Sequence, residues 1–161
     1  MAKPTKLYIL CSLTMAVLFA YSASVQLNDH DWYFWFPLYA GACIVNLLNW
    51  VISSKAIKYV AEASLWLGIF LFIKVVAEDI MIGISGFWSL DLSERVVREK
   101  IGSGLVVISM ILQLASSPSS KVSKQKQRHV GYGMAILVGF SYGLPLFFFV
   151  IQRGEMKFDQ V

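Results

Sequence analysis

Five long apolar runs alternate with short polar stretches along the whole chain. The runs cover residues of about 7–27, 33–52, 59–80, 101–117 and 130–151. A helix needs about 20 mainly apolar residues to cross a hydrocarbon core about 30 Å thick, because each residue rises about 1.5 Å. In lipid every backbone amide must be paired inside the structure, so such runs are interpreted as helices. The pattern predicts an all-α integral membrane protein, a compact bundle of five transmembrane helices in a single domain over residues 1–161.

The fourth run is the shortest, and two interpretations of it stay open. Asp91 is followed three residues later by Glu94, a spacing that resembles a capping box. In that interpretation the helix begins outside the membrane and continues inward. In the other, residues 83–92, with Phe87 and Trp88, form a partly buried interfacial segment. Both interpretations keep five crossings.

Composition agrees with this pattern and excludes several classes of protein. Hydrophobic residues make up 57% of the chain and charged residues 15%, against about 25% charged residues in a soluble domain. Mean hydropathy is +0.63. The formal net charge of +4 is concentrated on one side of the predicted membrane, so it describes topology and not nucleic-acid binding. A soluble domain and a nucleic-acid reader are therefore set aside.

The distribution of basic residues predicts an orientation, because short cytoplasmic loops collect Lys and Arg. The basic residues that flank one side of the predicted spans are Lys3, Lys6, Lys55, Lys58, Lys121, Lys124, Lys126 and Arg128. The other side has fewer, Arg95, Arg98, Lys100, Arg153 and Lys157, and they lie among most of the acidic residues. The N-terminus is predicted to be cytosolic and the C-terminus lumenal or extracellular, in a secretory-pathway or plasma membrane.

The first run also has features of a signal peptide. Lys3 and Lys6 precede it, and Ser22-Ala23-Ser24 is a conceivable cleavage site. The apolar run nevertheless continues through Leu27, which is longer than the 7–15 residues of a typical signal-peptide core. A retained membrane anchor is favoured.

Small residues recur every fourth position in two of the predicted spans. These residues are Ser12, Ala16, Ala20 and Ser24 in the first span and Gly131, Ala135, Gly139 and Gly143 in the fifth. Such stripes let helix backbones approach closely in lipid, so they predict helix contacts within the chain, between protomers of a homo-oligomer or with a membrane-protein partner. The amides of Asn46 and Asn49 in the second span are expected to bond across an interface.

Ionisable groups at membrane depth are functional candidates by default. Glu62 lies near the cytosolic end of the third span, where it can reach water. Lys74 lies deeper, and Glu78 follows it at the i,i+4 spacing of a helical ion pair. The favoured interpretation is an ion pair with a snorkelling lysine, and the alternative is a proton or ion pathway.

Polar residues gather where the spans reach the non-cytosolic side. They are Gln26, Asn28, Asp29 and Asp31 after the first span, Glu78 and Asp79 at the end of the third, and Glu94, Arg98 and Glu99 before the fourth. If these ends converge, one pocket would hold several carboxylates and a guanidinium, which suits a cation, a polar headgroup or a peptide amine. His30 is not accompanied by other residues in a metal-binding pattern, so no metal and no cofactor are predicted.

Two motifs resemble the transmembrane protein 220 family. The first is Val25-Gln26-Leu27-Asn28-Asp29-His30-Asp31 followed by Trp35 and Tyr39, and the second is E-x3-R-E-x2-G at Glu94, Arg98, Glu99 and Gly102. Length and hydropathy extend the similarity over nearly the whole chain. Family members commonly carry Pro where this chain has His30, which argues further against a metal role. The resemblance implies a multi-pass membrane architecture and directs attention to the polar residues, and it names no reaction.

Motifs for a phosphate-binding loop, a dinucleotide site, a serine hydrolase or a zinc enzyme are absent from the sequence. We therefore expect a non-enzymatic binding or membrane-organising component, with recognition by the polar residues on the non-cytosolic side. The alternative is a small intramembrane enzyme or carrier that acts on a lipid or amphiphile, with the same carboxylates as acid, base or cation ligands. Anionic lipid headgroups are expected partners of Lys121, Lys124, Lys126 and Arg128.

Overall fold

The computed structural model describes residues 5–28, 30–52, 54–82, 95–116 and 124–155. These residues form the helices α1 (Lys6–Gln26), α2 (Trp32–Leu48), α3 (Lys55–Ile82), α4 (Arg95–Ser116) and α5 (Lys124–Glu155). Within these ranges the backbone contains helices and turns and no strand. The all-α prediction is confirmed.

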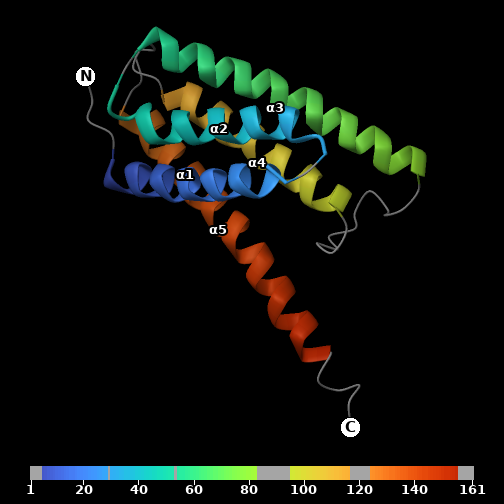
Figure 1. Ribbon diagram of the computed structural model, residues 1–161. Coiled ribbons are helices and arrows are strands. Elements are labelled where there is room, and N and C mark those ends of the chain that lie inside the picture. The colour runs from blue at the N-terminus through green and yellow to red at the C-terminus, as the bar shows by residue number, and fades with distance from the viewer. Residues whose placement is uncertain (1–4, 29, 53, 83–94, 117–123, 156–161) are drawn as a thin grey trace.

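Successive helices of the bundle run antiparallel to one another (Figure 1). Each helix packs against its neighbour in the sequence, α2 also contacts α4, and α5 also contacts α1. Helices α1 to α4 form the bundle, and α5 starts beside α1 and α4. In its second half α5 leaves the bundle and projects away from it (Figure 1). This departure opens the side of the bundle between α1, α4 and α5.

Four of these helices, α1, α3, α4 and α5, are long and apolar enough to cross a membrane. Helix α2 is apolar but shorter, with 17 residues, which lies at the lower end of the range of about 17–25 residues for a transmembrane helix. It ends at Leu48, four residues before the predicted limit, because the chain turns there: the amide of Ile52 donates to the carbonyl of Leu48 at 2.8 Å.

Helix α4 begins six residues before its apolar run. Its first turns hold Arg95, Glu99 and Lys100, which find ionic partners inside the fold and can therefore remain helical close to the bundle. This start agrees with a helix that begins outside the membrane and continues inward. The proposed cap at Asp91 and Glu94, and the alternative interfacial segment 83–92, lie outside the described residues.

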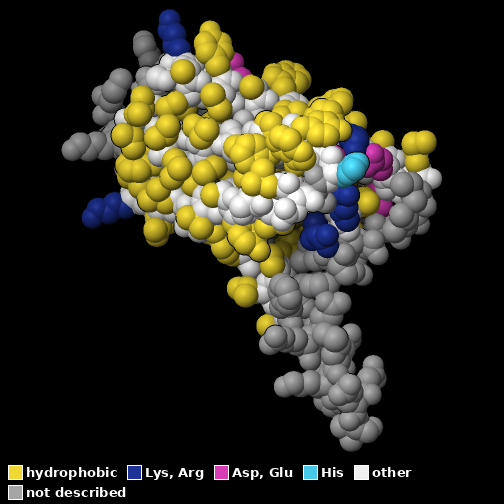
Figure 2. All heavy atoms as spheres, in the orientation of Figure 1, with side chains coloured by type: hydrophobic (Ala, Val, Ile, Leu, Met, Phe, Trp, Pro, Cys, Tyr) yellow, Lys and Arg dark blue, Asp and Glu magenta, His cyan; other side chains and the backbone are white. Residues whose placement is uncertain are grey.

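The bundle has a packed interior and an apolar exterior. Trp35, Phe19, Met15, Leu38 and Met110 are almost completely buried at its centre. Large apolar side chains also face outward, among them Trp66, which is 71% exposed, and Ile136, which is 74% exposed. Apolar side chains cover the flank of the bundle in Figure 2, and charged ones gather at its ends. An apolar flank with charged ends is the surface expected of a protein surrounded by lipid.

A buried polar network holds α1, α2 and α4 together in the half of the bundle near the N-terminus. Its centre is Gln113, whose Nε2 donates to Asn46 at 2.8 Å and to Ser12 at 3.0 Å. Its Oε1 accepts from Asn49 at 2.8 Å and from the hydroxyl of Tyr8 at 2.5 Å. Asn46 and Asn49 therefore bond across helix interfaces, as their place in an apolar span predicts.

The two stripes of small residues are only partly engaged within the chain. Ser12 and Ala16 are buried and Gly131 lies against Thr5 of the N-cap, whereas Ala20 and Ser24 are exposed. Ala135 is half-buried; Gly139 and Gly143 are exposed, and a Cβ placed on either would meet no described atom within 4 Å. The exposed half of each stripe stays a prediction of contact between protomers.

Candidate functional site

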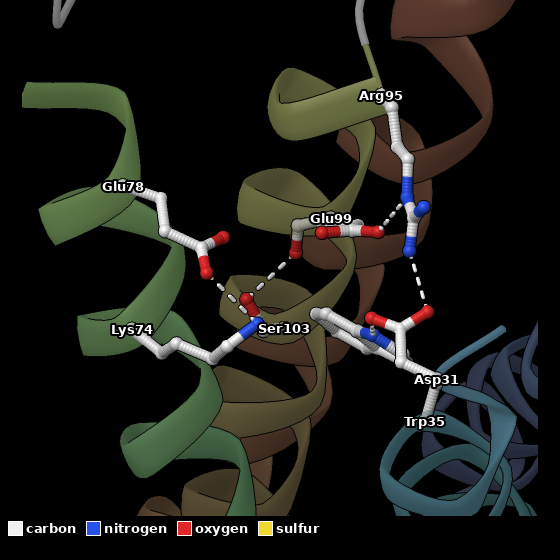
Figure 3. A network of polar contacts seen from close by, with 7 residues as sticks. All are labelled: Asp31, Trp35, Lys74, Glu78, Arg95, Glu99 and Ser103. Carbon is white, nitrogen blue, oxygen red and sulfur yellow. Dashed lines mark hydrogen bonds and ion pairs between the residues drawn. The ribbon is translucent and has the colours of Figure 1, made fainter. Parts of the chain in front are cut away.

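An ionic cluster joins α2 and α4 at the end of the bundle where α1 finishes (Figure 3). Arg95 lies at its centre. Its Nη2 donates to Oδ1 of Asp31 at 2.5 Å, and its Nε donates to Oε1 of Glu99 at 2.5 Å. The spacing of Arg95 and Glu99, four residues apart on one helix, places both side chains on the same face. A single guanidinium therefore holds two carboxylates, one that precedes α2 and one on α4 itself.

Asp31 precedes α2 and is oriented from two sides. Its Oδ2 accepts from the indole Nε1 of Trp35 at 3.1 Å, and its Oδ1 accepts from Arg95 (Figure 3). Partial burial acts to raise the pKa of the Asp31 carboxyl, but the hydrogen bond from Trp35 and the charge of Arg95 outweigh it and hold that pKa below its ordinary value. Asp31 is therefore ionised at neutral pH.

A second, deeper ion pair joins α3 to α4. The ammonium of Lys100 donates to Asp79 at 2.9 Å, and the two side chains are only 11% and 2% exposed. Lys74 and Glu78 form the predicted i,i+4 pair on α3 at 3.0 Å (Figure 3). Charge compensation explains how these groups remain near an apolar environment, since an unpaired buried charge is costly. Each described acid at this end is thus paired with a basic side chain, and Asp31 and Glu99 share Arg95.

The residues singled out from the sequence occupy different positions. Gln26, Arg98 and Glu99 line one groove, and Asp31 is not among its lining residues but pairs with Arg95, which is. Asn28 is exposed in the turn after α1. Asp29 and Glu94 lie outside the described residues. The binding role of this set stays a prediction, but three of its members share one concave surface.

The groove lies between α1, α4 and α5 and has a volume of about 530 Å³. Its walls are mainly apolar and include Leu18, Phe19, Val25, Leu105, Phe140 and Leu144. Gln26, Arg95, Arg98 and Glu99 form its polar mouth, at the level where α1 ends and α4 begins. An apolar cavity with a few convergent polar groups is the usual form of a small-molecule site.

The course of α5 creates this groove. The hydroxyl of Tyr142 donates to the Thr14 carbonyl at 3.0 Å, and the hydroxyl of Ser141 lies 3.6 Å from the sulfur of Met15, so α5 is fastened to the middle of α1. Beyond these contacts the two helices diverge (Figure 1). Pro145, which lines the groove, cannot donate an intrahelical hydrogen bond.

A glycine shapes the floor of the groove. Gly102 of α4 faces the hydroxyl of Tyr39 so closely that a Cβ at this position would clash with it. Both residues line the groove, and the ring of Tyr39 stacks on Phe19 and Trp35 with centroid distances of 6.3 Å and 6.1 Å. The absence of a side chain at Gly102 therefore lets the aromatic floor pack directly against α4.

One acceptor at the mouth is unsatisfied. Oε1 of Gln26 is buried and has no hydrogen-bond partner among the described residues. Buried side-chain acceptors are nearly always bonded, to protein or to an ordered water molecule.

Several contacts of the site were not predicted from the sequence. Arg95 was placed among the outer bases without a role, although its spacing to Glu99 could have revealed the pair. Asp79 and Lys100 are 21 residues apart, and no local pattern links them. The apolar lining from α1 and α5 is indistinguishable in the sequence from residues that face lipid.

A metal site was not predicted, and the described residues contain no group of three His, Cys, Asp or Glu side chains able to hold a metal ion. His30 is exposed. The ionisable residues that line the groove are instead two arginines, one carboxylate and the phenols of Tyr21 and Tyr39.

An all-helical bundle with several membrane-length helices defines this chain as a multi-pass integral membrane protein. Residues 18–115 match the family described as "Transmembrane family 220, helix". The match covers more than half of the chain, from the second half of α1 almost to the end of α4, and the chain belongs to this family. No curated protein sequence and no solved structure is significantly similar to it. The family resemblance of the two motifs is thereby confirmed.

Proposed function

We propose that this protein is a non-enzymatic binding component that takes an amphiphile from the surrounding membrane into the groove between α1, α4 and α5. The observation that carries the proposal is the groove itself, with apolar walls along the helices and a polar mouth at their ends. Its volume of about 530 Å³ falls within the range of about 300–1,000 Å³ typical of small-molecule sites. An amphiphile would place its tail along Leu18, Phe140 and Leu144 and its headgroup at Arg98.

The two carboxylates that Arg95 holds support binding rather than catalysis. Glu99 and Asp31 are both held by Arg95 at 2.5 Å. A general base must reach the proton that it removes, and its pKa must be matched to that task. Two carboxylates fixed on one guanidinium are better suited to orienting that guanidinium. The alternative, an enzyme or carrier that uses Glu99 as acid or base, requires Glu99 to leave Arg95.

The orientation and the partners belong to the same proposal. With a cytosolic N-terminus, the mouth of the groove faces the lumen or the exterior of a secretory-pathway or plasma membrane. Anionic lipid on the cytosolic face would then contact Lys121, Lys124, Lys126 and Arg128. Of these residues, Arg128 has an exposed side chain. Lys121 and the side chains of Lys124 and Lys126 lie outside the described part of the structure. The exposed small residues of α1 and α5 offer a surface for a second copy.

Two tryptophan substitutions on α1 test the groove. Ser22 lines it, whereas Ser24 is exposed two residues further on the same helix, and each hydroxyl bonds to a carbonyl of α1 itself. The full-length protein is purified in mild detergent, and the lipids that it retains are identified by mass spectrometry. We expect the wild type and Ser24→Trp to retain an amphiphile enriched over the bulk membrane, and Ser22→Trp to lose it.

Equal lipid profiles in all three proteins would contradict the proposal, since filling the groove would then have no consequence. A Glu99→Gln variant separates the binding function from the enzymatic alternative. If the protein only binds, cells that carry this variant keep a normal lipid composition. If it catalyses a reaction, an unprocessed lipid accumulates in them.

A further inference from the structure

One hydroxyl at the floor of the groove makes no hydrogen bond within the described part of the protein. It belongs to Tyr39 of α2, which lines the groove and is only 4% exposed. This hydroxyl neither donates to nor accepts from any described residue. The equally buried hydroxyl of Tyr8, by contrast, bonds to Gln113 and Ser116. Burying a hydroxyl without a partner is costly and uncommon, so the position of Tyr39 requires an explanation.

The hydroxyl lies between the polar mouth and the apolar interior of the groove. It is placed against Gly102 of α4, in the space that a side chain at this position would fill. Gly102 follows Arg98 by four residues, so at a rise of about 1.5 Å per residue it lies about 6 Å deeper than the mouth. Leu105, one turn further along α4, belongs to the apolar walls.

The other described hydroxyls that line the groove are either bonded or exposed. Ser22 and Ser141 each donate to a carbonyl of their own helix, at 2.9 Å and 3.0 Å. Tyr21 is 69% exposed, so its hydroxyl can bond to the surroundings. Among these described hydroxyls, Tyr39 alone combines burial with a proton that has no acceptor in the protein.

The depth and the chemistry of this hydroxyl indicate which ligand group would satisfy it. A phenol O–H is a hydrogen-bond donor, so its partner must be an acceptor. In a glycerolipid the carbonyl of the acyl ester is a strong acceptor and lies between the headgroup and the hydrocarbon tail. An ether-linked lipid has the same headgroup and tail but no carbonyl at this point.

We propose that the Tyr39 hydroxyl donates a hydrogen bond to the ester carbonyl of the bound amphiphile, so that the groove prefers ester-linked over ether-linked lipids. This inference rests on the proposed function and names the ligand class of the same site. The ring of Tyr39 stacks on Phe19 and Trp35, which fixes the hydroxyl before the ligand arrives. Gly102 leaves the space that the hydroxyl needs.

Two single-chain lipids with the same headgroup and tail length test the inference. They are oleoyl lysophosphatidylcholine, which contains an ester, and its octadecenyl ether analogue. The full-length protein is placed in nanodiscs of a dialkyl-ether phosphatidylcholine, so that the bilayer offers no competing ester carbonyl, and binding is followed by native mass spectrometry. We expect the ester lipid to bind about fivefold more tightly, the net effect of one hydrogen bond.

Two variants that each lose one phenol hydroxyl assign the preference to a residue. Tyr39→Phe should lower the affinity for the ester lipid to that for the ether lipid and leave the ether affinity unchanged. Tyr21→Phe is the matched control on an exposed tyrosine of the same groove, and it should keep the preference. Because the Tyr39 hydroxyl bonds to no described residue, ligand-free Tyr39→Phe should unfold at or above the wild-type temperature.

The outcomes separate this inference from the proposed function. Equal affinities of the wild type for the two lipids, or a preference that survives in Tyr39→Phe, would overturn the inference and leave the groove as an amphiphile site. A ligand-free Tyr39→Phe protein that unfolds well below the wild-type temperature would also overturn it, since the hydroxyl would then have a partner in the fold. If neither lipid binds saturably and Ser22→Trp changes nothing, both proposals fail. The wild-type affinity ratio tests the ester preference without any variant.

Discussion

At the scale of single residues, the contact between Gly102 and Tyr39 fixes the floor of the groove. The Tyr39 ring is buried and stacked, so it cannot move aside easily when a Cβ is added at Gly102. We expect Gly102→Ala to destabilise the protein by about 1–3 kcal/mol, the usual cost of overpacking. The measurement is the thermal unfolding midpoint in detergent.

Gly139→Ala is the matched control for this substitution. Gly139 is also helical, but a Cβ there meets no described atom within 4 Å. Its replacement should leave stability unchanged or raise it by up to about 1 kcal/mol, the difference in helix propensity between alanine and glycine. Equal unfolding midpoints for Gly102→Ala and the wild type would show that Tyr39 does not lie against α4.

The buried pair Asp79–Lys100 gives a second prediction at the residue scale. Asp79→Asn leaves the Lys100 ammonium without its carboxylate in a region where both side chains are almost fully buried, which should cost about 3–5 kcal/mol. The double variant Asp79→Asn/Lys100→Met removes both charges and should recover part of that loss. Both are measured by denaturant unfolding in micelles.

Glu62→Gln serves as the control, because Glu62 is 43% exposed and its contact with Lys58 is 3.8 Å. We expect it to change the unfolding free energy by less than about 1 kcal/mol. If Asp79→Asn is as mild as Glu62→Gln, the α3–α4 pair contributes little to the fold.

At the scale of helices, Gln113 is the main polar connection between α1, α2 and α4. Gln113→Leu removes hydrogen bonds to Tyr8, Ser12, Asn46 and Asn49. Interhelical hydrogen bonds in membrane proteins contribute about 0.6 kcal/mol each, so the expected loss is about 2 kcal/mol.

Ser24→Ala is compared with it, since the exposed Ser24 hydroxyl bonds to the Tyr21 carbonyl of its own helix. That change should cost less than about 0.5 kcal/mol. Unfolding of both variants followed by circular dichroism measures the difference. A Gln113→Leu variant that unfolds at the wild-type midpoint would contradict the role of the network.

The helices themselves were predictable because a membrane-length apolar run has few other stable conformations. Local patterns also predicted the Lys74–Glu78 pair. The early start of α4 is accompanied by ion pairs with Asp31, which precedes α2, and with Asp79 of α3, so the run of residues 101–117 alone could not reveal it. The departure of α5 from the bundle is likewise invisible in its sequence, although Gly143 and Pro145 lie where the two helices separate.

At the scale of the whole molecule, the candidate site was only partly predictable from the sequence. The cluster of Gln26, Arg98 and Glu99 was found from residues near helix ends, and it does line one groove. Its chemistry was not fully predictable, because Arg95 pairs with two carboxylates that are 68 residues apart in the sequence numbering, Asp31 and Glu99. The pairing across helices therefore engages two of the acids that the sequence suggested for binding.

The proposed threading of the chain makes a further prediction at this scale. With five crossings and a cytosolic N-terminus, the two termini lie on opposite sides of the membrane, as the distribution of Lys and Arg predicts. Epitope tags are placed on the two termini of the full-length protein and probed with antibodies before and after membrane permeabilisation. The two tags should become accessible under different conditions, because they lie in different compartments. Tags that react in the same compartment would contradict five crossings and place the mouth of the groove elsewhere.

The most direct test of the account is to map where a membrane amphiphile touches the protein. The purified full-length chain is incubated in nanodiscs with a single-chain lipid that carries a photoreactive group in its tail, and the adducts are located by peptide mass spectrometry. We predict saturable adducts on groove residues of α1 and α5, such as Leu18, Phe140 and Leu144, and their loss in Ser22→Trp. If adducts form only on outward residues such as Trp66 and Phe70 of α3, and remain unchanged in Ser22→Trp, binding in the groove is contradicted.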